Sequence, residues 1–179
     1  MSESRTDQRI STFIANLNRL DAGGKAKLKR SAGKPFDEAN RNLGLFYGLL
    51  PHAGVAMSQE PKYWLVATLY PLADATARGN LGDALHRARS VQYKKGLDRR
   101  VEALLDSDEA QLAYRLGQAV RFLRSHRVPI NWQSLLEDLL LWEHPSRFVQ
   151  KKWAKAYFRL PSEQLEQPAS EDITTQETD

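Results

Sequence analysis

Apolar residues recur at helical spacing along most of the chain. Ile10, Phe13, Ile14, Leu17 and Leu20 lie three or four residues apart, which places them on one stripe of a predicted first helix. No segment alternates apolar and polar residues over more than a few positions, as a half-buried strand would. The pattern therefore predicts an all-α fold, a helical bundle of about eight or nine helices.

Helix-breaking and capping residues set the boundaries that the sequence predicts. Asp21 is placed to cap a short basic helix over about residues 22–32, and Pro51 ends a third helix over about 36–49. Gly54 to Pro61 is predicted to be a loop. The later predicted helices cover about residues 63–70, 81–93, 97–105, 106–126, 132–140 and 146–160.

Particular residues support these assignments. Asp106 and Glu109 have the spacing of a capping box and are predicted to open the long helix, while Asn131 is placed to cap the next one. Gly44 and Gly48 have a spacing that is typical of close helix packing. The four tryptophans have apolar neighbours at helical spacing, so we expect them in the core first and in base stacking only second.

The length of 179 residues suits one domain or two small sub-bundles. We predict an N-terminal sub-bundle over 1–95, a C-terminal sub-bundle over 96–160 and an acidic tail over 161–179. The tail holds few apolar residues, so it is predicted to be disordered. No signal peptide and no membrane-spanning run is evident, and we expect a cytoplasmic protein.

The net charge of +4 conceals a strong asymmetry along the chain. The tail holds six acidic residues and no Lys or Arg, so the first 160 residues carry +10. A folded body with this charge favours a polyanionic partner. An anionic membrane fits less well, because the basic helices lack a wide apolar face that could insert.

The basic residues gather into four blocks that contain few acidic residues. In the last predicted helix Arg147, Lys151, Lys155 and Arg159 step by four, opposite an apolar side and with no predicted compensating carboxylate. Binding of phosphates would explain this repetition of like charge, although solvated helix faces remain an alternative. The blocks are Lys25, Lys27, Lys29, Arg30 and Lys34; Arg87, Arg89, Lys94, Lys95, Arg99 and Arg100; Arg115, Arg121, Arg124 and Arg127; and Arg147, Lys151, Lys152, Lys155 and Arg159.

Motifs of catalysis and of metal binding are missing from the sequence. The chain has no cysteine, its four histidines lack the spacing of metal ligands, and no phosphate-binding loop or nucleophile elbow occurs. Asp106 and Asp108 stand at a helix start, where capping explains them better than catalysis. We therefore predict a protein that is not an enzyme and holds no metal and no cofactor.

Seven stretches of the chain together resemble one known family. They are LKRSAG (28–33), FYGLLP (46–51), YWLVATLYPL (63–72), GNLGDALHR (79–87), LDRRVEALLDSD (97–108), VPINWQSLLEDLLLW (128–142) and HPSRFVQKKWAKAYF (144–158). In their order and spacing they resemble the CasB family, the small helical subunit of the type I-E CRISPR Cascade surveillance complex. The acidic tail is not part of the resemblance.

The resemblance implies a role inside a larger assembly. Members of the CasB family are all-helical and form a head-to-tail dimer along the filament of CasC subunits that holds the CRISPR RNA, in a complex that also contains CasA, CasD and CasE. Their basic surface contacts the target DNA strand and helps to hold the displaced strand of the R-loop, without catalysis. Pairing between RNA and DNA reads the sequence, so such a subunit needs only sequence-blind contacts.

The resemblance also implies contacts at particular residues. Lys29 and Arg30 lie in the part that resembles the DNA-facing helix of the family, and Arg99 and Arg100 match a paired-arginine position. Lys62 and Arg121 also stand where basic residues are usual, whereas the acidic stretch 106–109 departs from some relatives. The predicted nucleic-acid-binding residues are Lys27, Lys29, Arg30, Lys34, Lys62, Arg99, Arg100, Arg115, Arg121, Arg124, Arg147, Lys151, Lys152 and Lys155.

Two other functions remain open at the level of sequence. A stand-alone helical regulator would read one specific DNA site, which calls for a helix-turn-helix that we do not find. A structural adaptor would use the basic faces to bind acidic protein partners.

Overall fold

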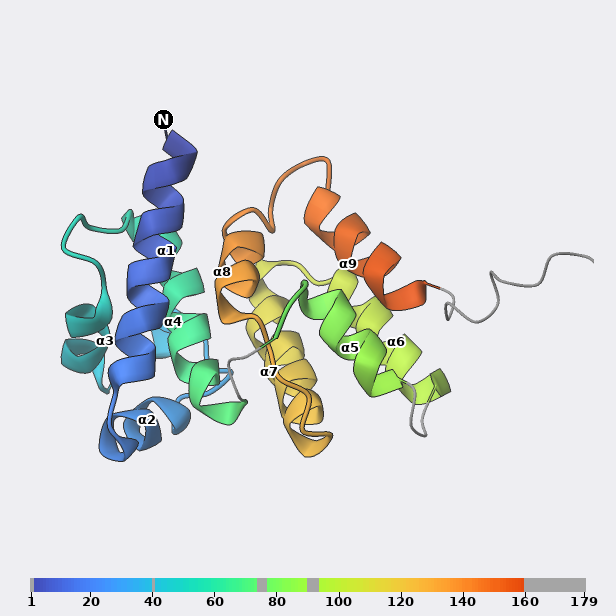
Figure 1. The fold of residues 1–179 in the computed structure, drawn as a ribbon, viewed down its shortest axis with the longest axis horizontal. Coiled ribbons are helices and arrows are strands. Elements are labelled where there is room, and N and C mark those ends of the chain that lie inside the picture. Colours follow the sequence, from blue (N-terminus) through green and yellow to red (C-terminus); the bar gives the residue numbers. More distant parts are fainter. Residues whose placement is uncertain (1, 40, 74–76, 90–93, 160–179) are drawn as a thin grey trace, which may run out of the picture.

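The structure is a computed structural model that describes residues 2–39, 41–73, 77–89 and 94–159 (Figure 1). Within these ranges the chain forms α-helices and short 3₁₀ turns and no strand, which confirms the predicted all-α fold. The predicted disorder of residues 161–179 concerns a segment outside the described residues. The helices are α1 Ser2–Arg19, α2 Ala22–Lys29, α3 Leu43–Leu49, α4 Glu60–Leu69, α5 Leu81–Arg89, α6 Lys94–Leu105, α7 Glu109–Ser125, α8 Trp132–Leu140 and α9 Phe148–Phe158, and the 3₁₀ turns are Phe36–Glu38, Met57–Gln59 and Tyr70–Leu72.

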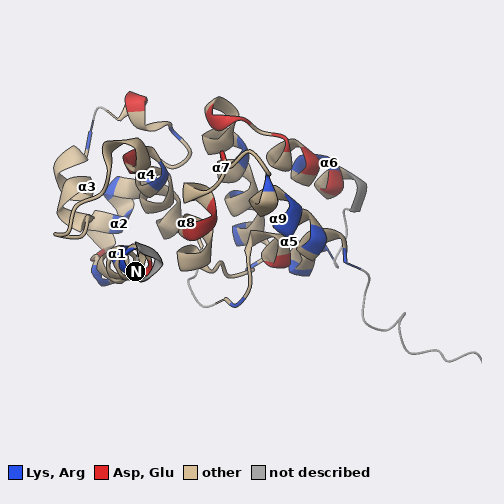
Figure 2. Ribbon diagram, turned by 90° about the horizontal axis from the view of Figure 1, so that it is seen from above, with Lys and Arg blue, Asp and Glu red and all other residues tan. Residues whose placement is uncertain are grey.

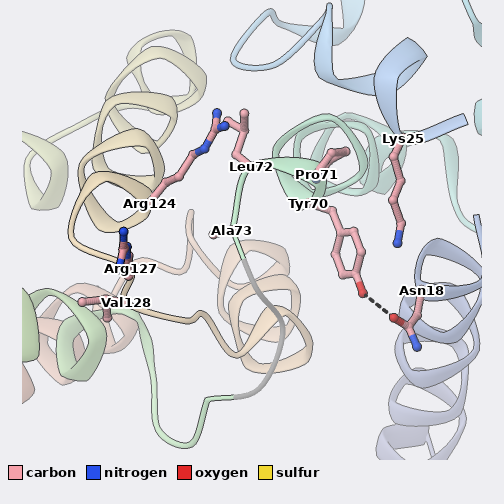
Figure 3. Close-up of a pocket in the computed structure, with 9 residues that line it drawn as sticks. All are labelled: Asn18, Lys25, Tyr70, Pro71, Leu72, Ala73, Arg124, Arg127 and Val128. Atoms are coloured by element: carbon pink, nitrogen blue, oxygen red, sulfur yellow. Dashed lines mark hydrogen bonds between the residues drawn. The ribbon is translucent and has the colours of Figure 1, made fainter. Parts of the chain in front are cut away.

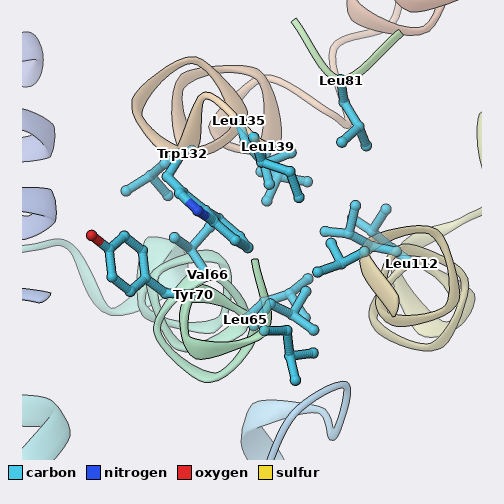
Figure 4. Close-up of a cluster of buried hydrophobic side chains, with 14 of the residues drawn as sticks. Leu65, Val66, Tyr70, Leu81, Leu112, Trp132, Leu135 and Leu139 are labelled. Carbon is cyan, nitrogen blue, oxygen red and sulfur yellow. The ribbon is translucent and has the colours of Figure 1, made fainter. Parts of the chain in front are cut away.

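Helix α4 lies in the centre of the fold. Every residue from 62 to 70 is buried, as expected of a helix with apolar side chains on most of its faces. Leu65 and Val66 of α4 face Leu135 of α8 and Leu112 of α7 in the core (Figure 4). These contacts join segments that are far apart in the sequence.

The helices pack across the domain boundary that the sequence predicts near residue 95. Helix α8 packs against α1 and α4, and α5 packs most extensively against α9 (Figure 1). The division into two sub-bundles stays a prediction. These helix contacts join elements from both sides of the predicted boundary.

Helices α5 and α9 approach closely at Gly82. A Cβ atom at this position would lie 2.2 Å from the carbonyl oxygen of Trp153, so only glycine allows the two backbones to come so near. Farther along the pair, Nδ1 of His86 lies 2.8 Å from the carbonyl oxygen of Tyr157. The close approach fixes α9 on the body of the protein through backbone contacts as well as through side chains.

Two of the three predicted helix caps are confirmed. Asp21 accepts a hydrogen bond from the backbone N–H of Gly24 (2.7 Å), and Asn131 accepts one from that of Ser134 (3.1 Å). The prediction of Asp106 as the cap of the long helix is wrong. Asp108 caps α7 instead, by accepting from the backbone N–H of Gln111 (2.9 Å), because α6 runs on to Leu105 and leaves only a short turn.

The structure also corrects the predicted helix over 36–49. A 3₁₀ turn at Phe36–Glu38 is followed by a break, and Asn42 has a left-handed backbone (φ 65°) just before α3 begins. The close packing predicted at Gly44 and Gly48 is wrong, since a Cβ atom at either residue would meet nothing within 4 Å. All four tryptophans are buried, which confirms that they serve the core.

Candidate nucleic-acid interface

A cleft of about 580 Å³ opens between α2, the end of α7 and the 3₁₀ turn Tyr70–Leu72 (Figure 3). Three of the side chains that line it are cationic, Lys25 from α2 and Arg124 and Arg127 from the C-terminal end of α7. In Figure 3 Lys25 lies beside Tyr70, while the two arginines stand on the other wall. The lining residues are Asn18, Lys25, Tyr70, Pro71, Leu72, Ala73, Arg124, Arg127 and Val128.

The local sequence explains why these cations face the solvent. In α2, Gly24 and Leu28 are buried, Lys25 between them is half-buried at the cleft and Lys27 is exposed. At the end of α7, Arg127 adopts a left-handed backbone (φ 55°), which a non-glycine residue rarely takes and which ends the helix. Within the described part of the chain, no carboxylate pairs with Lys25, Arg124 or Arg127. The cleft thus concentrates uncompensated positive charge.

A neutral polar pair lies on one wall of this cleft. The hydroxyl of Tyr70 donates to Oδ1 of Asn18 (3.3 Å), and the ring of Tyr70 packs on Trp132 with 5.5 Å between the ring centroids. Burial raises the pKa of Tyr70, so this hydroxyl stays protonated and neutral at physiological pH. The cleft therefore offers cations and neutral donors to an anion, and the described residues that line it include no carboxylate that would repel it.

A second group of cations lies just after the end of α2. Arg30, Lys34 and Arg41 line a cleft of about 340 Å³ together with Glu38 and Trp64. Glu38 is the one acid among the described residues that line this cleft. Arg30 and Lys34 belong to the predicted binding set and are exposed, as are Lys27 and Lys29 on α2. The first basic block is therefore presented to solvent around α2.

Arg121 connects α7, which carries Arg124, to the loop after α2, which carries Lys34. Its guanidinium donates to the backbone carbonyl oxygen of Ala32 (2.9 Å), in the loop between Arg30 and Lys34. Arg124 follows Arg121 by three residues and therefore lies one turn farther along α7. Arg121 is exposed but already engaged, so its first role in the structure is to tie α7 to the α2 region.

Helix α9 only partly matches its prediction. It carries no acidic residue of its own, as Figure 2 shows, and Lys151 and Lys155 are exposed. The prediction that this face lacks compensating carboxylates is wrong for Arg147, Lys152 and Arg159, because acids on other elements pair with them. Lys152 pairs with Asp138 of α8, Arg159 with Asp83 of α5 (2.8 Å), and Arg147 with Asp106 (3.9 Å).

Lys62, a predicted binding residue, has a structural role and is not exposed. Its side chain is buried, and its Nζ lies 2.9 Å from Oε1 of Glu109 at the start of α7. The pKa of Glu109 is lowered most by a hydrogen bond from the side chain of Glu143 and next by the hydrogen bond from Lys62. Lys62 is therefore not offered to a ligand in this arrangement, and the surface proposed below leaves it out.

The remaining predicted residues lie on α6 and α7. Arg99 and Arg100 are exposed, and Arg115 is half-buried beside Arg100 in a narrow cleft between the two helices. The predicted binding set lacks Lys25, Arg127 and Arg41, although the first two belong to the basic blocks. Only the fold brings Lys25 and Arg127 together, because about a hundred residues separate them in the sequence.

In the ranges that the structure covers, no three His, Asp or Glu side chains gather as metal ligands would. No described helix is both long and apolar enough to cross a membrane.

The fold and the cleft define a small all-helical protein with cations concentrated around α2 and the end of α7. Residues 24–158 match the family described as CRISPR-associated protein Cse2. The chain therefore belongs to the Cse2 family, as its resemblance to CasB implies.

Individual relatives agree with this assignment. A CRISPR-associated protein Cse2 from Thermus thermophilus is 31% identical over 153 residues, which cover 82% of this chain and 88% of that protein. The crystal structure of M. ruber CasB is 30% identical with a TM-score of 0.70, covering 84% and 93% of the two chains. A chain of a CRISPR RNA-guided surveillance complex shares the fold at 21% identity, with a TM-score of 0.72 over 84% and 92% of the chains.

Proposed function

We propose that this protein is a non-catalytic subunit of a type I-E CRISPR Cascade complex, where it binds nucleic-acid backbone without sequence preference. It stabilises the target and displaced DNA strands of the R-loop. The observation that carries the proposal is the convergence of Lys25, Arg124 and Arg127 on one cleft without a paired carboxylate among the described residues. Membership of the Cse2 family and the shared fold with a chain of a surveillance complex support it.

The chemistry of the cleft suits phosphates better than base edges. Lysine and arginine contacts to phosphate position a strand and release counterions, but they carry no sequence information. In an RNA-guided complex, base pairing with the guide supplies the sequence reading. A subunit with cations on two clefts, one lined by Lys25 of α2 and the other by Arg30 and Lys34 just after α2, can follow a strand of any sequence.

The assembly follows from the same proposal. The partners would be the CRISPR RNA, the target DNA, the CasC filament with the CasA, CasD and CasE subunits, and a second copy of this chain. Helix α2, beside which the clefts lie, and helix α9 are placed toward different ends of the fold (Figure 1). This placement allows one copy to contact nucleic acid at two separate places.

The test compares the wild-type protein with a variant that combines Lys25→Gln, Arg124→Gln and Arg127→Gln. The Kd for a mixed-sequence single-stranded DNA is measured between about 50 mM and about 200 mM salt. The slope of log K against log salt should fall in magnitude by about 2, since each lost phosphate contact removes about 0.7. Arg5→Gln on α1 removes an exposed cation from the opposite end of that helix to α2 and should leave the slope unchanged.

A salt-independent wild-type Kd, or a triple variant that binds like the wild type, would contradict the proposal. A variant that keeps its DNA affinity but no longer co-purifies with the other subunits would favour the adaptor function instead. Protection of one defined DNA sequence in a footprint would favour a stand-alone regulator.

A further inference from the structure

Two lysines on the outer side of α9 lack a counter-charge among the described residues. Lys151 and Lys155 are exposed and stand four residues apart, about 6 Å along the helix axis. No described carboxylate pairs with either, whereas Lys152 and Arg159 pair with Asp138 and Asp83. Like charges at this spacing cost a helix about 0.2–0.5 kcal/mol, which a bound anion would offset.

An anionic segment of the same chain follows α9 in the sequence. Residues 161–179 follow α9 almost directly and hold six acidic residues without one Lys or Arg. The match to the Cse2 family ends at residue 158, so this segment lies beyond the part that the family shares. Its charge is opposite to that of the neighbouring helix face.

The chain length permits the segment to turn back over α9. Glu163 follows Arg159 by four residues, which span up to about 14 Å when extended, and Lys155 lies about 6 Å back along the helix. Glu166 follows Arg159 by seven residues, which span up to about 25 Å, and Lys151 lies about 12 Å back. Both lysines are therefore within reach of the first acids of the segment.

We propose that residues 161–179 dock on the Lys151–Lys155 face of α9 and compete there with nucleic acid. The docking stands on the charges and the reach described above, and only the competition rests on the proposed function. Ion pairs between exposed side chains contribute less than about 1 kcal/mol each and are screened by salt. Tethering raises the effective concentration of the segment to about the millimolar range. The contact is therefore reversible and lowers nucleic-acid affinity without abolishing it.

The contact can be measured on the full chain without nucleic acid. The protein has no cysteine, so Thr175→Cys carries a single spin label near the end of the acidic segment. At low salt the label should broaden the amide NMR signals of Lys151 and Lys155. The broadening should disappear near 0.5 M salt, where the Debye length is only a few ångströms, and also in the Lys151→Gln/Lys155→Gln variant. Unbroadened α9 signals at low salt would overturn the docking.

The competition has a separate readout. A full-length variant in which the six acids of residues 161–179 become Asn or Gln should bind single-stranded DNA about 3- to 10-fold more tightly at low salt. This gain should vanish when Lys151 and Lys155 are also changed to Gln. A wild-type protein that binds DNA, with less than a twofold gain in the variant, would overturn the competition. A docked segment on a protein that does not bind nucleic acid would overturn the proposed function and leave the docking intact.

Discussion

The Nη2 atom of Arg121 donates a hydrogen bond to the backbone carbonyl oxygen of Ala32, 2.9 Å away and 89 residues earlier in the chain. The guanidinium also lies against two glycines, because a Cβ atom at Gly33 or Gly117 would stand 3.5 Å or 3.1 Å from Nη1. Gly33 itself has a left-handed backbone (φ 80°). The contact ties α7 to the loop after α2, and it therefore sets how the cations of the two elements face a common ligand.

Arg121→Lys should destabilise the protein although it keeps the positive charge. A lysine lacks the planar fork that reaches Ala32, and loss of this hydrogen bond should cost about 0.5–1.5 kcal/mol of unfolding free energy. Denaturant unfolding measures the change. Arg124→Lys serves as the control, since Arg124 makes no described ion pair and should unfold like the wild type. Equal stability of both variants would contradict the structural role of Arg121.

Gly82→Ala should destabilise the contact between α5 and α9. The added Cβ atom would meet the carbonyl oxygen of Trp153 at 2.2 Å, and relieving such overpacking costs about 1–3 kcal/mol. Gly48→Ala in α3 is the matched control, because its Cβ atom would meet open space. That variant should gain about 0.5–1 kcal/mol from the better helix propensity of alanine. The two midpoints of thermal unfolding should therefore move in opposite directions.

Asp138 should matter more for stability than its partner Lys152. The Asp138 side chain is buried and accepts from Nε1 of Trp153 (2.6 Å) as well as from Lys152. Asp138→Ala leaves the buried indole N–H without an acceptor, at a cost of about 1–3 kcal/mol. Lys152→Met removes the half-exposed cation but leaves the Asp138 carboxylate its hydrogen bond from Trp153, so it should cost less than Asp138→Ala. A larger loss for Lys152→Met in urea unfolding would show that this assignment is wrong.

Lys62→Met should leave the Kd for nucleic acid within twofold of the wild-type value, because Nζ of Lys62 is buried against Glu109. Lys62 helps to lower the pKa of Glu109 from 4.5, so the carboxylate contributes stability that is present above pH 4.5. That contribution disappears as the pH falls through the lowered pKa. The wild type should therefore exceed the variant in stability at neutral pH, and the difference should shrink below about pH 4.5.

Unfolding titrations at neutral and acidic pH measure this difference. Because Glu109 is half exposed, the gap at neutral pH should stay below about 1 kcal/mol. A gap that widens on acidification, or a tenfold weaker Kd, would show that Lys62 serves another role.

Helix content and the buried core could be predicted from the sequence. Ile10, Phe13 and Leu17 of the predicted apolar stripe are fully buried in α1, and the all-round apolar pattern of α4 marks the central helix. Local hydrogen bonding explains the success of the caps at Asp21 and Asn131, because the donor and acceptor are three residues apart. The error at Asp106 is also local, because Asp106 and Asp108 lie in the same short turn and either could serve as the cap.

By itself the sequence determined the helices, the tryptophan core, the asymmetry of charge and the resemblance to a family. Tertiary structure alone decided which of the described cations are free. The acids that pair with Lys152 and Arg159 come from α8 and α5, and the acid that pairs with Lys62 comes from α7. The cleft that unites Lys25 with Arg127 likewise forms only when α2 and α7 meet. Periodicity reports which face of a helix is buried, but the charge across from a side chain depends on helix partners that are distant in sequence.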